Sequence, residues 1–315
     1  MKIQNSKQAI VRLAAILVSL WSSSHPTHAA EYCWRASWGV FPDQVDSTML
    51  LGNDPTNRPG PVLTNGELVL RTYTKNTNST DGMADYQYYG QAAPNVVMPA
   101  QLVIEADVQL ESGSTTFSGR PPAYIVWVGA AGVLGMLGME EGSIFLGRNH
   151  TQHWDTVSVP SGDGFHHYRI EVDSPTMAHL STSQVRVYRD FQPVPILQAF
   201  NGGDGANAAF TYIGAEIYFG DGTDWAFGVS RWRSFRHNAA SSPSRPVMFI
   251  RAAPDEVCWS SCPGALYSIH YCSQLSPPNW LPLFANVVGS GDITCVTDPL
   301  PRREAQRFYR VEVQR

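Results

Sequence analysis

Three acidic residues stand close together in residues 101–111, a segment in which apolar and polar residues alternate. This alternation predicts a β-strand that presents Glu105, Asp107 and Glu111 on one face. Two carboxyl groups about 5–5.5 Å apart can cleave a glycosidic bond, one as general acid and the other as nucleophile. Residues two apart on a strand are separated by about 6.6 Å, and residues six apart by about 20 Å. Glu105 and Asp107 are therefore the candidate catalytic pair, and Glu111 would join them only through a β-bulge.

A second set of residues has the side chains that recognise sugars. A saccharide needs aromatic faces for stacking and fixed polar groups for its hydroxyls. His153 and Trp154 lie in a polar segment, which favours their exposure, whereas Trp127 has the competing interpretation of a core residue. The candidate ligand-binding set is Glu105, Asp107, Trp127, Arg148, His153 and Trp154.

Metal sites are weakly indicated. The carboxylates of Asp221 and Asp224 could hold calcium, although a plain turn explains the same residues. Cysteines 258, 262, 272 and 295 could hold zinc, but no histidine lies at finger spacing. The five cysteines of the chain favour disulfides in an exported protein, and their odd number leaves at least one thiol unpaired or paired between chains. No other cofactor is predicted, and no nucleophile-elbow, phosphate-loop or His-Glu-x-x-His motif occurs.

The start of the chain predicts export. Lys2, Lys7 and Arg12 precede an apolar run, residues 13–21, and a polar stretch follows. This order is typical of a signal peptide over residues 1–30. An uncleaved N-terminal anchor is the alternative, although the run is too short to span a bilayer. We expect a secreted, periplasmic or cell-surface protein with no membrane insertion after cleavage.

The charge balance argues against nucleic acid as a partner. The chain has 22 basic and 27 acidic residues, a formal net charge of −5. Removal of residues 1–30 would take away three basic residues and no acidic one, leaving 19 basic against 27 acidic residues and a net charge of −8. Nucleic-acid binding needs a basic patch, and no basic run is present. Binding to anionic membrane surfaces is disfavoured for the same reason.

The remaining pattern is all-β. Strands with turn residues between them are expected at residues 67–74, 124–129, 133–139, 143–146, 164–172, 184–189, 215–219 and 229–235. Phe191 is expected on the same face as Val185 and Val187, and residues 34–41 are expected to form a loop. Evenly spaced short strands without a sustained helical period predict a sandwich or jelly roll.

Four segments carry a resemblance to a known superfamily. They are residues 164–172 (Gly-Phe-His-His-Tyr-Arg-Ile-Glu-Val), 185–194 (Val-Arg-Val-Tyr-Arg-Asp-Phe-Gln-Pro-Val), 218–222 (Tyr-Phe-Gly-Asp-Gly) and 230–232 (Ser-Arg-Trp). Together they resemble the closing strands of concanavalin A-like, laminin G-like jelly rolls, and the likeness covers residues 31–238. The resemblance implies a jelly-roll sandwich. The superfamily includes lectins, glycan-binding modules, glycosidases, lyases and adhesion domains, so it does not by itself imply one activity.

The chain departs from that superfamily in two places. Asp190-Phe191 stands where Asp-Gly is usual, and Arg233 stands where an acidic residue often follows the tryptophan. Laminarinase-type hydrolases of the superfamily carry Glu-x-Asp-x-Glu or Glu-x-Asp-x-x-Glu on one strand. Glu105 and Asp107 match the first two positions of that motif, but Gln109 or Leu110 stands at the third.

The C-terminal part reads as a second unit. Residues 239–246 are small, polar and proline-bearing, as in a linker. Residues 247–315 resemble the short fibronectin type III-like modules at the C-termini of exported bacterial proteins. The resemblance implies a small β-sandwich with a disulfide between Cys258 and Cys295, facing outward on neighbouring strands. The core expected for this module is Trp259, Tyr267, Ile269, Tyr271 and Tyr309.

These observations predict an exported, non-catalytic protein that binds a polysaccharide or recognises a cell-surface glycan. One alternative is a glycoside hydrolase or polysaccharide lyase that uses Glu105 and Asp107 on the concave face of the jelly roll. A structural surface or adhesion protein is the second alternative.

Overall fold

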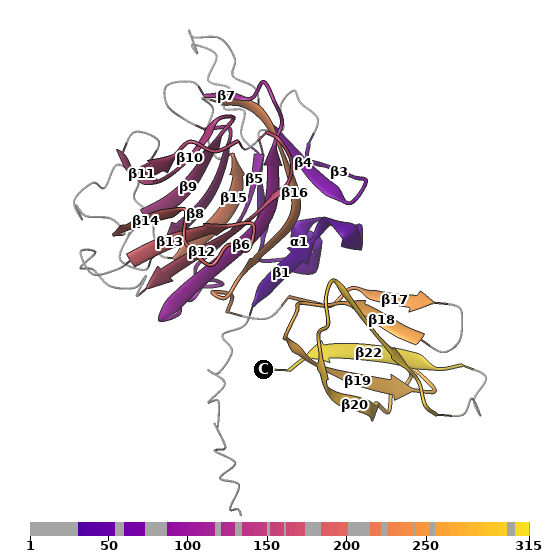
Figure 1. Ribbon diagram of the computed structural model, residues 1–315. Helices are drawn as coiled ribbons and strands as arrows, with labels where there is room; N and C mark the ends of the chain where they lie inside the picture. The colour runs from indigo at the N-terminus through magenta and orange to yellow at the C-terminus, as the bar shows by residue number, and fades with distance from the viewer. Residues whose placement is uncertain are drawn as a thin grey trace, which may run out of the picture.

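A computed structural model describes most of the chain after its first thirty residues. The described residues are 31–53, 60–72, 87–116, 121–129, 134–149, 152–160, 162–173, 184–200, 215–221, 226–241, 244–251, 256–300 and 306–314. Two large antiparallel sheets form a sandwich, and two small sheets form a separate C-terminal module (Figure 1). The all-β prediction is therefore confirmed. The signal peptide predicted over residues 1–30 lies outside the described residues.

The larger sheet has nine strands. The strand order along its main path is β14 (Leu197–Phe200), β13 (Gln184–Arg189), β12 (His166–Asp173), β6 (Gln101–Leu110), β16 (Ala226–His237), β4 (Glu67–Thr72) and β3 (Val62–Thr64). Two short strands, β1 (Tyr32–Arg35) and β7 (Thr115–Thr116), also pair with β16. β6 is the middle strand of the seven on this path, between β12 and β16.

The second sheet has seven strands. Its order is β11 (Gln152–Val157), β10 (Ser143–Asn149), β9 (Leu134–Glu140), β8 (Ala123–Val128), β15 (Glu216–Asp221), β5 (Gln87–Ala92) and β2 (Leu50–Asn53). Each strand predicted in the first 238 residues overlaps one of these sixteen strands, whereas β14 was not predicted. The sandwich prediction is confirmed as well.

The core forms between the two sheets from the inward-facing half of each strand. On β6 these residues are Leu102, Ile104, Ala106, Val108 and Leu110, all of which are buried. Because successive strand residues point to opposite faces, the polar residues between them face away from the core. Phe219 of β15 stacks on Phe235 of β16 with 4.2 Å between ring centroids, which joins the sheets across the core.

Two local predictions were wrong. Residues 34–41 are not a loop, because Trp34 belongs to β1 and pairs with Phe235 of β16. Behind it follow a 3-10 turn, η1 (Ala36–Trp38), and a one-turn helix, α1 (Pro42–Val45). A strand of four residues is too short to show an alternation. Phe191 does not continue the inward row of β13, since the chain turns after Arg189 and leaves the Phe191 side chain 81% exposed.

The C-terminal module consists of two three-stranded sheets. Their orders are β17 (Met248–Arg251), β18 (Glu256–Ser260), β21 (Ile293–Thr297), and β20 (Leu281–Val288), β19 (Leu266–Cys272), β22 (Phe308–Val313). Trp259, Tyr267 and Ile269 are buried at its centre, as expected, and Tyr309 packs against them partly buried. Tyr271 is not a core residue. Its ring instead lies under the Arg307 guanidinium, 5.2 Å from the ring centroid.

Residues of the predicted linker 239–246 form hydrogen bonds with the sandwich. The Val97 amide donates to the Ala239 carbonyl at 2.8 Å, and the Cys33 amide donates to the hydroxyl of buried Ser244 at 2.9 Å. The module itself is tied to the start of the sandwich by a disulfide between Cys33 and Cys262. It lies next to β1 and α1 in Figure 1.

Polar contacts support the same junction. The indole of Trp38 donates to the Asp292 carbonyl at 2.7 Å, and the Arg35 guanidinium lies 2.9 Å from the Asp292 carboxylate. The two units are thus held together at several points near the N-terminal strand.

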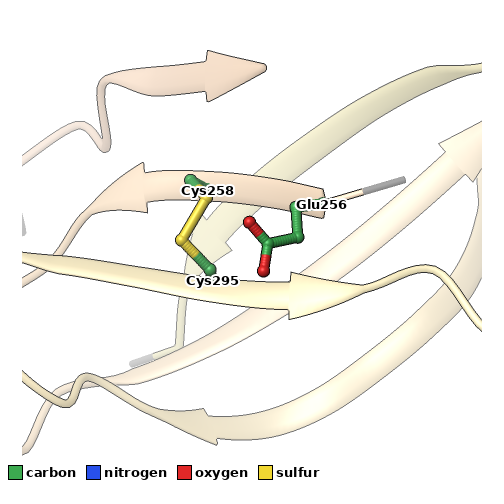
Figure 2. A group of neighbouring side chains, drawn as sticks. All are labelled: Glu256, Cys258 and Cys295. Carbon is green, nitrogen blue, oxygen red and sulfur yellow. A yellow bond between two sulfur atoms is a disulfide. The ribbon is translucent and has the colours of Figure 1, made fainter. Parts of the chain in front are cut away.

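The predicted disulfide between Cys258 and Cys295 is confirmed, but the exposure predicted for both residues is not. Cys258 and Cys295 lie directly opposite each other on β18 and β21 and form a disulfide, with the Glu256 carboxylate beside it (Figure 2). Cys258 is buried and Cys295 is exposed, so the two do not both face solvent. The two disulfides use three of the four cysteines considered for zinc and leave Cys272 as a buried thiol. Among the described residues, no helix is long and apolar enough to cross a membrane.

Candidate functional site

The outer face of the nine-stranded sheet carries a row of charged and aromatic side chains. Register places Arg169 of β12 and Arg236 of β16 directly opposite Glu105 of β6, one on each side. Tyr188 of β13 extends the row beyond Arg169. Side chains opposite each other in an antiparallel sheet are close enough to interact. Four strands therefore contribute to one continuous row.

A β-bulge in β16 makes this row possible. The register with β6 shifts between Trp232 and Ser234, so that Arg233 is the extra residue. A bulge of this kind re-aims the side chains that follow it. Trp232 and Phe235 are both buried in the core, and Ser234 and Arg236 face outward next to Asp107 and Glu105.

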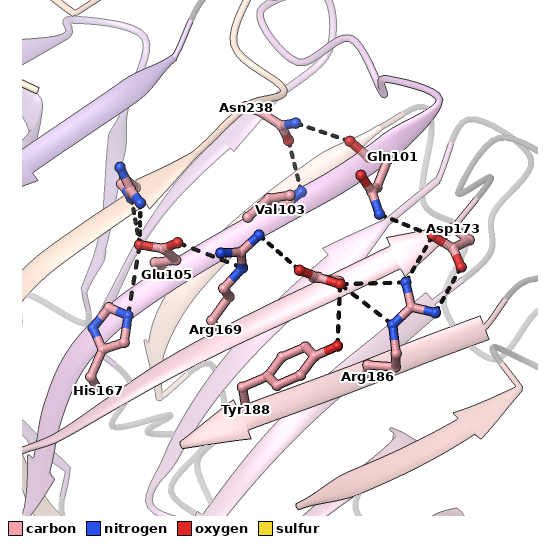
Figure 3. A network of polar contacts seen from close by, with 11 residues as sticks. Gln101, Val103, Glu105, His167, Arg169, Asp173, Arg186, Tyr188 and Asn238 are labelled. Atoms are coloured by element: carbon pink, nitrogen blue, oxygen red, sulfur yellow. Dashed lines mark hydrogen bonds and ion pairs between the residues drawn. The ribbon is translucent and has the colours of Figure 1, made fainter. Parts of the chain in front are cut away.

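Glu105 is the centre of the row, and it is only 8% exposed. The Arg236 Nε donates to Glu105 Oε2 at 2.6 Å. On the other side, Arg169 Nε lies 3.8 Å from Oε1 and His167 Nε2 lies 3.7 Å from Oε2 (Figure 3). The carboxylate is thus firmly bound by one arginine and only loosely approached by the other two groups.

A second row, next to the first, consists of His167, Asp107 and Ser234. Asp107 Oδ1 lies 2.8 Å from His167 Nδ1, and Asp107 Oδ2 accepts a hydrogen bond from the Ser234 hydroxyl. Burial by itself would raise the pKa of Asp107, but the hydrogen bonds from His167 and Ser234 and the nearby positive charge outweigh it and lower the pKa. Asp107 is therefore ionised at neutral pH and orients the His167 ring.

A third group of charges borders the site. Arg169 donates to Glu171 Oε1 at 2.8 Å, while Arg186 lies 3.4 Å from Glu171 Oε2 and 3.1 Å from Asp173 (Figure 3). Each arginine of this border has a carboxylate partner, so it adds little net charge.

These rows border a shallow cavity of about 470 Å³, which we call the outer pocket. Its lining residues are Glu105, His167, Arg169, Glu171, Tyr188, Phe191, Gln192, Pro193 and Arg236. The volume falls within the range of small-molecule binding sites. The outer pocket combines one exposed aromatic ring with several convergent polar groups.

Phe191 is held over the pocket by an unusual turn. Asp190 and Phe191 have φ angles of 52° and 60°, in the left-handed region that glycine favours. The Asp190 carboxylate accepts from the His167 amide at 3.0 Å. The Phe191 ring stacks on the His167 ring with 4.2 Å between centroids and 11° between planes. A bulky side chain at a glycine-favouring position costs stability, and such positions cluster at functional sites.

The candidate catalytic residues do lie in this site. Glu105 lines the outer pocket, and Asp107 lies next to it in contact with His167. The Glu105 carboxylate is bound to Arg236, and the Asp107 carboxylate is bound to His167 and Ser234. Glu111 is engaged elsewhere, where its carboxylate accepts from Arg231 Nε at 2.6 Å.

Three other predicted ligand residues, Trp127, His153 and Trp154, do not join Glu105 and Asp107. Trp127 is fully buried between the sheets, so its predicted role as an exposed platform is corrected: β8 turns its indole into the core. His153 and Trp154 lie on β11 of the seven-stranded sheet, where the His153 ring stacks on Phe145 at 3.7 Å. Trp154 is partly buried against the core. The predicted set is therefore divided between the two sheets.

Three predicted residues cannot be placed. The side chains of Arg148 and Asp221, and the whole of Asp224, lie outside the described residues. The calcium prediction at Asp221 and Asp224 therefore stays a prediction.

Of the residues that line the outer pocket, only Glu105 was predicted as a site residue from the sequence. The alternation in residues 164–172 put His167 and Arg169 on the face opposite the buried Tyr168 and Ile170, and that signal was available. Which residues of β6 and β16 they would meet depends on strand register, which a single sequence does not show. Arg236 was hidden further by the bulge before it.

The chain was compared with family models, with curated proteins and with solved structures. No family model matches the sequence, and no curated protein matches it. The carbohydrate recognition domain of Emp46p in its metal-free form has a TM-score of 0.40 and 10% identity, over 66% of this chain and 97% of that one. A carbohydrate esterase from Shiga toxin-encoding bacteriophage phi24B has a TM-score of 0.44 and 13% identity, over 67% and 97%.

An endo-1,3-beta-glucanase from Streptomyces sioyaensis has a TM-score of 0.34 and 15% identity, over 58% of this chain and 79% of that chain. Their names describe a carbohydrate recognition domain, a carbohydrate esterase and a glucanase. Similarity at this level concerns the fold and carries no argument about what this chain does.

Proposed function

We propose that this protein binds a saccharide in the outer pocket and does not transform it. The observation that carries the proposal is Phe191, an 81% exposed aromatic ring fixed above convergent polar groups by a left-handed turn. Sugar rings stack their C–H faces on such aromatic surfaces, and fixed polar groups select their hydroxyls. A turn without a functional demand would carry glycine at that position, as the related superfamily usually does.

The pairing of the carboxylates favours binding over catalysis. A retaining or inverting glycosidase needs one carboxylic acid and one carboxylate, each free to reach the scissile bond. Glu105 is bound by Arg236, and Asp107 is bound by His167 and Ser234. The two acids instead act as fixed elements of a recognition surface.

The surroundings of the site fit an exported receptor. Two disulfides support the proposal of an oxidising compartment, and with the predicted signal peptide we propose that the protein is secreted, periplasmic or on the cell surface. In this proposal residues 31–238 form the recognition domain. Residues 247–315, tied to it through Cys33–Cys262, act as a spacer that holds the pocket in one orientation.

Replacement of Phe191 by glycine tests the proposal. Glycine adopts the left-handed conformation at no steric cost, so we expect Phe191→Gly to leave the melting temperature unchanged or slightly higher. The same change removes the stacking surface, and we expect binding to polysaccharide to fall by at least about tenfold, or about 1.4 kcal/mol. Affinity electrophoresis and pull-down on insoluble glycans measure the binding, and release of reducing or unsaturated ends is scored alongside.

Val194→Ala is the matched control, because Val194 is 68% exposed on the same loop and does not line the outer pocket. Its binding should equal that of the unmodified protein. If Phe191→Gly binds polysaccharide as well as the unmodified protein does, the outer pocket is not the binding site. Release of ends by the unmodified protein would show an enzyme in place of a receptor.

A further inference from the structure

We infer that the outer pocket selects an uncharged saccharide, because it offers two convergent acceptors, His167 Nε2 and Glu105 Oε1, to neighbouring hydroxyls of one sugar ring. The inference rests on the proposed function and adds the class of ligand. The inference depends on which atoms of His167 and Glu105 are free to accept a hydrogen bond. The contacts of Asp107 and Glu105 determine this.

Asp107 sets the tautomer of His167. An ionised carboxylate can only accept a hydrogen bond, so the Asp107 contact at 2.8 Å requires a proton on His167 Nδ1. A second bond, from the Ser234 hydroxyl to the other Asp107 oxygen, holds the carboxylate in place. In the neutral imidazole ring the Nε2 atom then carries a lone pair and no proton. That nitrogen belongs to a lining residue of the outer pocket.

Glu105 supplies the second acceptor. Its Oε2 atom is taken by Arg236. Its Oε1 atom forms no hydrogen bond within the described part of the chain, and Arg169 Nε approaches it only to 3.8 Å. His167 Nε2 and Glu105 Oε2 are 3.7 Å apart, so the two acceptor groups face each other without bonding. A ligand that donates a hydrogen bond to each would satisfy both.

Two adjacent hydroxyls of a sugar ring have that chemistry. A site built to receive donors discriminates strongly against ligands that cannot supply them, because its buried polar groups then stay unpaired. A carboxylate or sulfate group on the ligand has only hydrogen-bond acceptors, so it could not bond to His167 Nε2 or Glu105 Oε1. The half-exposed Arg169 remains close enough to donate to a hydroxyl oxygen, so a hydroxyl can be bound both as donor and as acceptor.

Charge balance supports a neutral ligand. Arg169, Arg186 and Arg236 each have a carboxylate partner, namely Glu171, Asp173 and Glu105. An anionic sugar would have to displace one of these carboxylates from its arginine. A cationic amino sugar would be placed between arginines. A neutral sugar disturbs none of the three pairs.

The experiment compares ligand classes on the full-length protein purified after export. Binding is measured for neutral xylo- and laminari-oligosaccharides, for oligogalacturonate and for chitosan oligomers. We expect the best neutral ligand to bind at least tenfold more tightly than the best charged one. Tighter binding of the acidic or the amine-bearing oligomers would overturn the inference but leave the proposed function intact. Binding to none of the panel would remove the proposed function and the inference with it.

A spectroscopic measurement tests the positioning role of Asp107 directly. Nitrogen chemical shifts of the His167 ring in the unmodified protein should report the Nδ1–H tautomer at pH 7.5, and an Nε2–H or doubly protonated ring would overturn the inference. In Asp107→Asn the amide can donate to Nδ1, which moves the proton to Nε2. We expect the shifts to invert and neutral-glycan affinity to fall about tenfold.

The matched control is Asp163→Asn. Asp163 pairs with the neighbouring His166 at 2.8 Å and does not line the outer pocket. It should change neither the His167 shifts nor the affinity. An equal loss of affinity in Asp163→Asn would show a general effect of weakening an Asp–His pair, contrary to a role for the tautomer of His167.

Discussion

Replacing Cys33 and Cys262 together by serine is expected to destabilise the protein more than any other change considered. The two residues are 229 positions apart, so their disulfide restricts nearly the whole described chain in the unfolded state. The chain-entropy relation gives about 5 kcal/mol of stabilisation for a loop of this length. Both side chains are buried, so the serine hydroxyls add to the cost.

The variant should also uncouple the two units. Without the disulfide, the junction keeps the Trp38 and Arg35 contacts with Asp292, which are one hydrogen bond from a buried indole and one partly exposed ion pair, each of modest energy. We expect urea unfolding, followed by fluorescence, to change from one transition into two. The control is Cys258→Ser with Cys295→Ser, whose separation of 37 gives about 4 kcal/mol. That loss should be confined to the C-terminal module. An unchanged single transition in the Cys33 and Cys262 variant would contradict the proposed role of this disulfide.

The sandwich is expected to lose stability as the pH falls below about 6.5, which is well above the pH at which carboxylates are protonated. His237 at the end of β16 is buried, and burial lowers its pKa from 6.5 to about 3. Its Nδ1 accepts from the Ala239 amide at 3.3 Å, and no described residue bonds its Nε2. The ring stacks on Tyr32 of β1, 5.3 Å away. The folded protein therefore holds this histidine neutral.

The sign of the effect follows from proton binding. Between about pH 3 and 6.5 the unfolded chain binds a proton at His237 and the folded chain does not, so stability falls as the pH falls. At pH 5 the loss amounts to about 2 kcal/mol, since each unit below 6.5 contributes about 1.4 kcal/mol. The lowered pKa values of Asp107 and Asp298 act in another window, because the stability they add is lost only below about pH 4.

Urea unfolding measured from pH 8 to pH 4 checks this expectation. The unmodified protein should lose stability steadily below pH 6.5. His237→Phe keeps an aromatic ring next to Tyr32 and has no proton to gain, so its stability should be nearly flat down to about pH 4.5. The same slope in both proteins would assign the acid sensitivity to other groups.

The fold was predictable from the sequence where the alternation is long. The ten residues of β6 and the eight of β12 show their inward rows directly, because one buried face fixes which residues are apolar. The four residues of β1 carry no such signal, and their place was decided by pairing with β16 and by the disulfide at Cys33. Trp127 was ambiguous for another reason. Every residue of β8 is buried, so its sequence does not distinguish the two faces.

The site was predictable only in part. Glu105 and Asp107 were found because charges alternate with apolar residues on one strand. Their partners come from β12 and β16, sixty or more residues away along the chain. The bulge after Trp232 shifts every later residue of β16 by one position, and nothing in the sequence marks it. Phe191 was the one pocket residue outside β6 that the sequence set apart, because it stands where the superfamily that the sequence resembles usually has glycine.

Hydrogen exchange with and without a bound neutral oligosaccharide tests the central claim most directly. Since the ligand would cover the outer pocket, we predict slower exchange of amides in residues 166–171 and 187–193, with no change in β10 and β11. Protection confined to β10 and β11, around His153 and Trp154, would place the binding surface on the seven-stranded sheet and contradict the account.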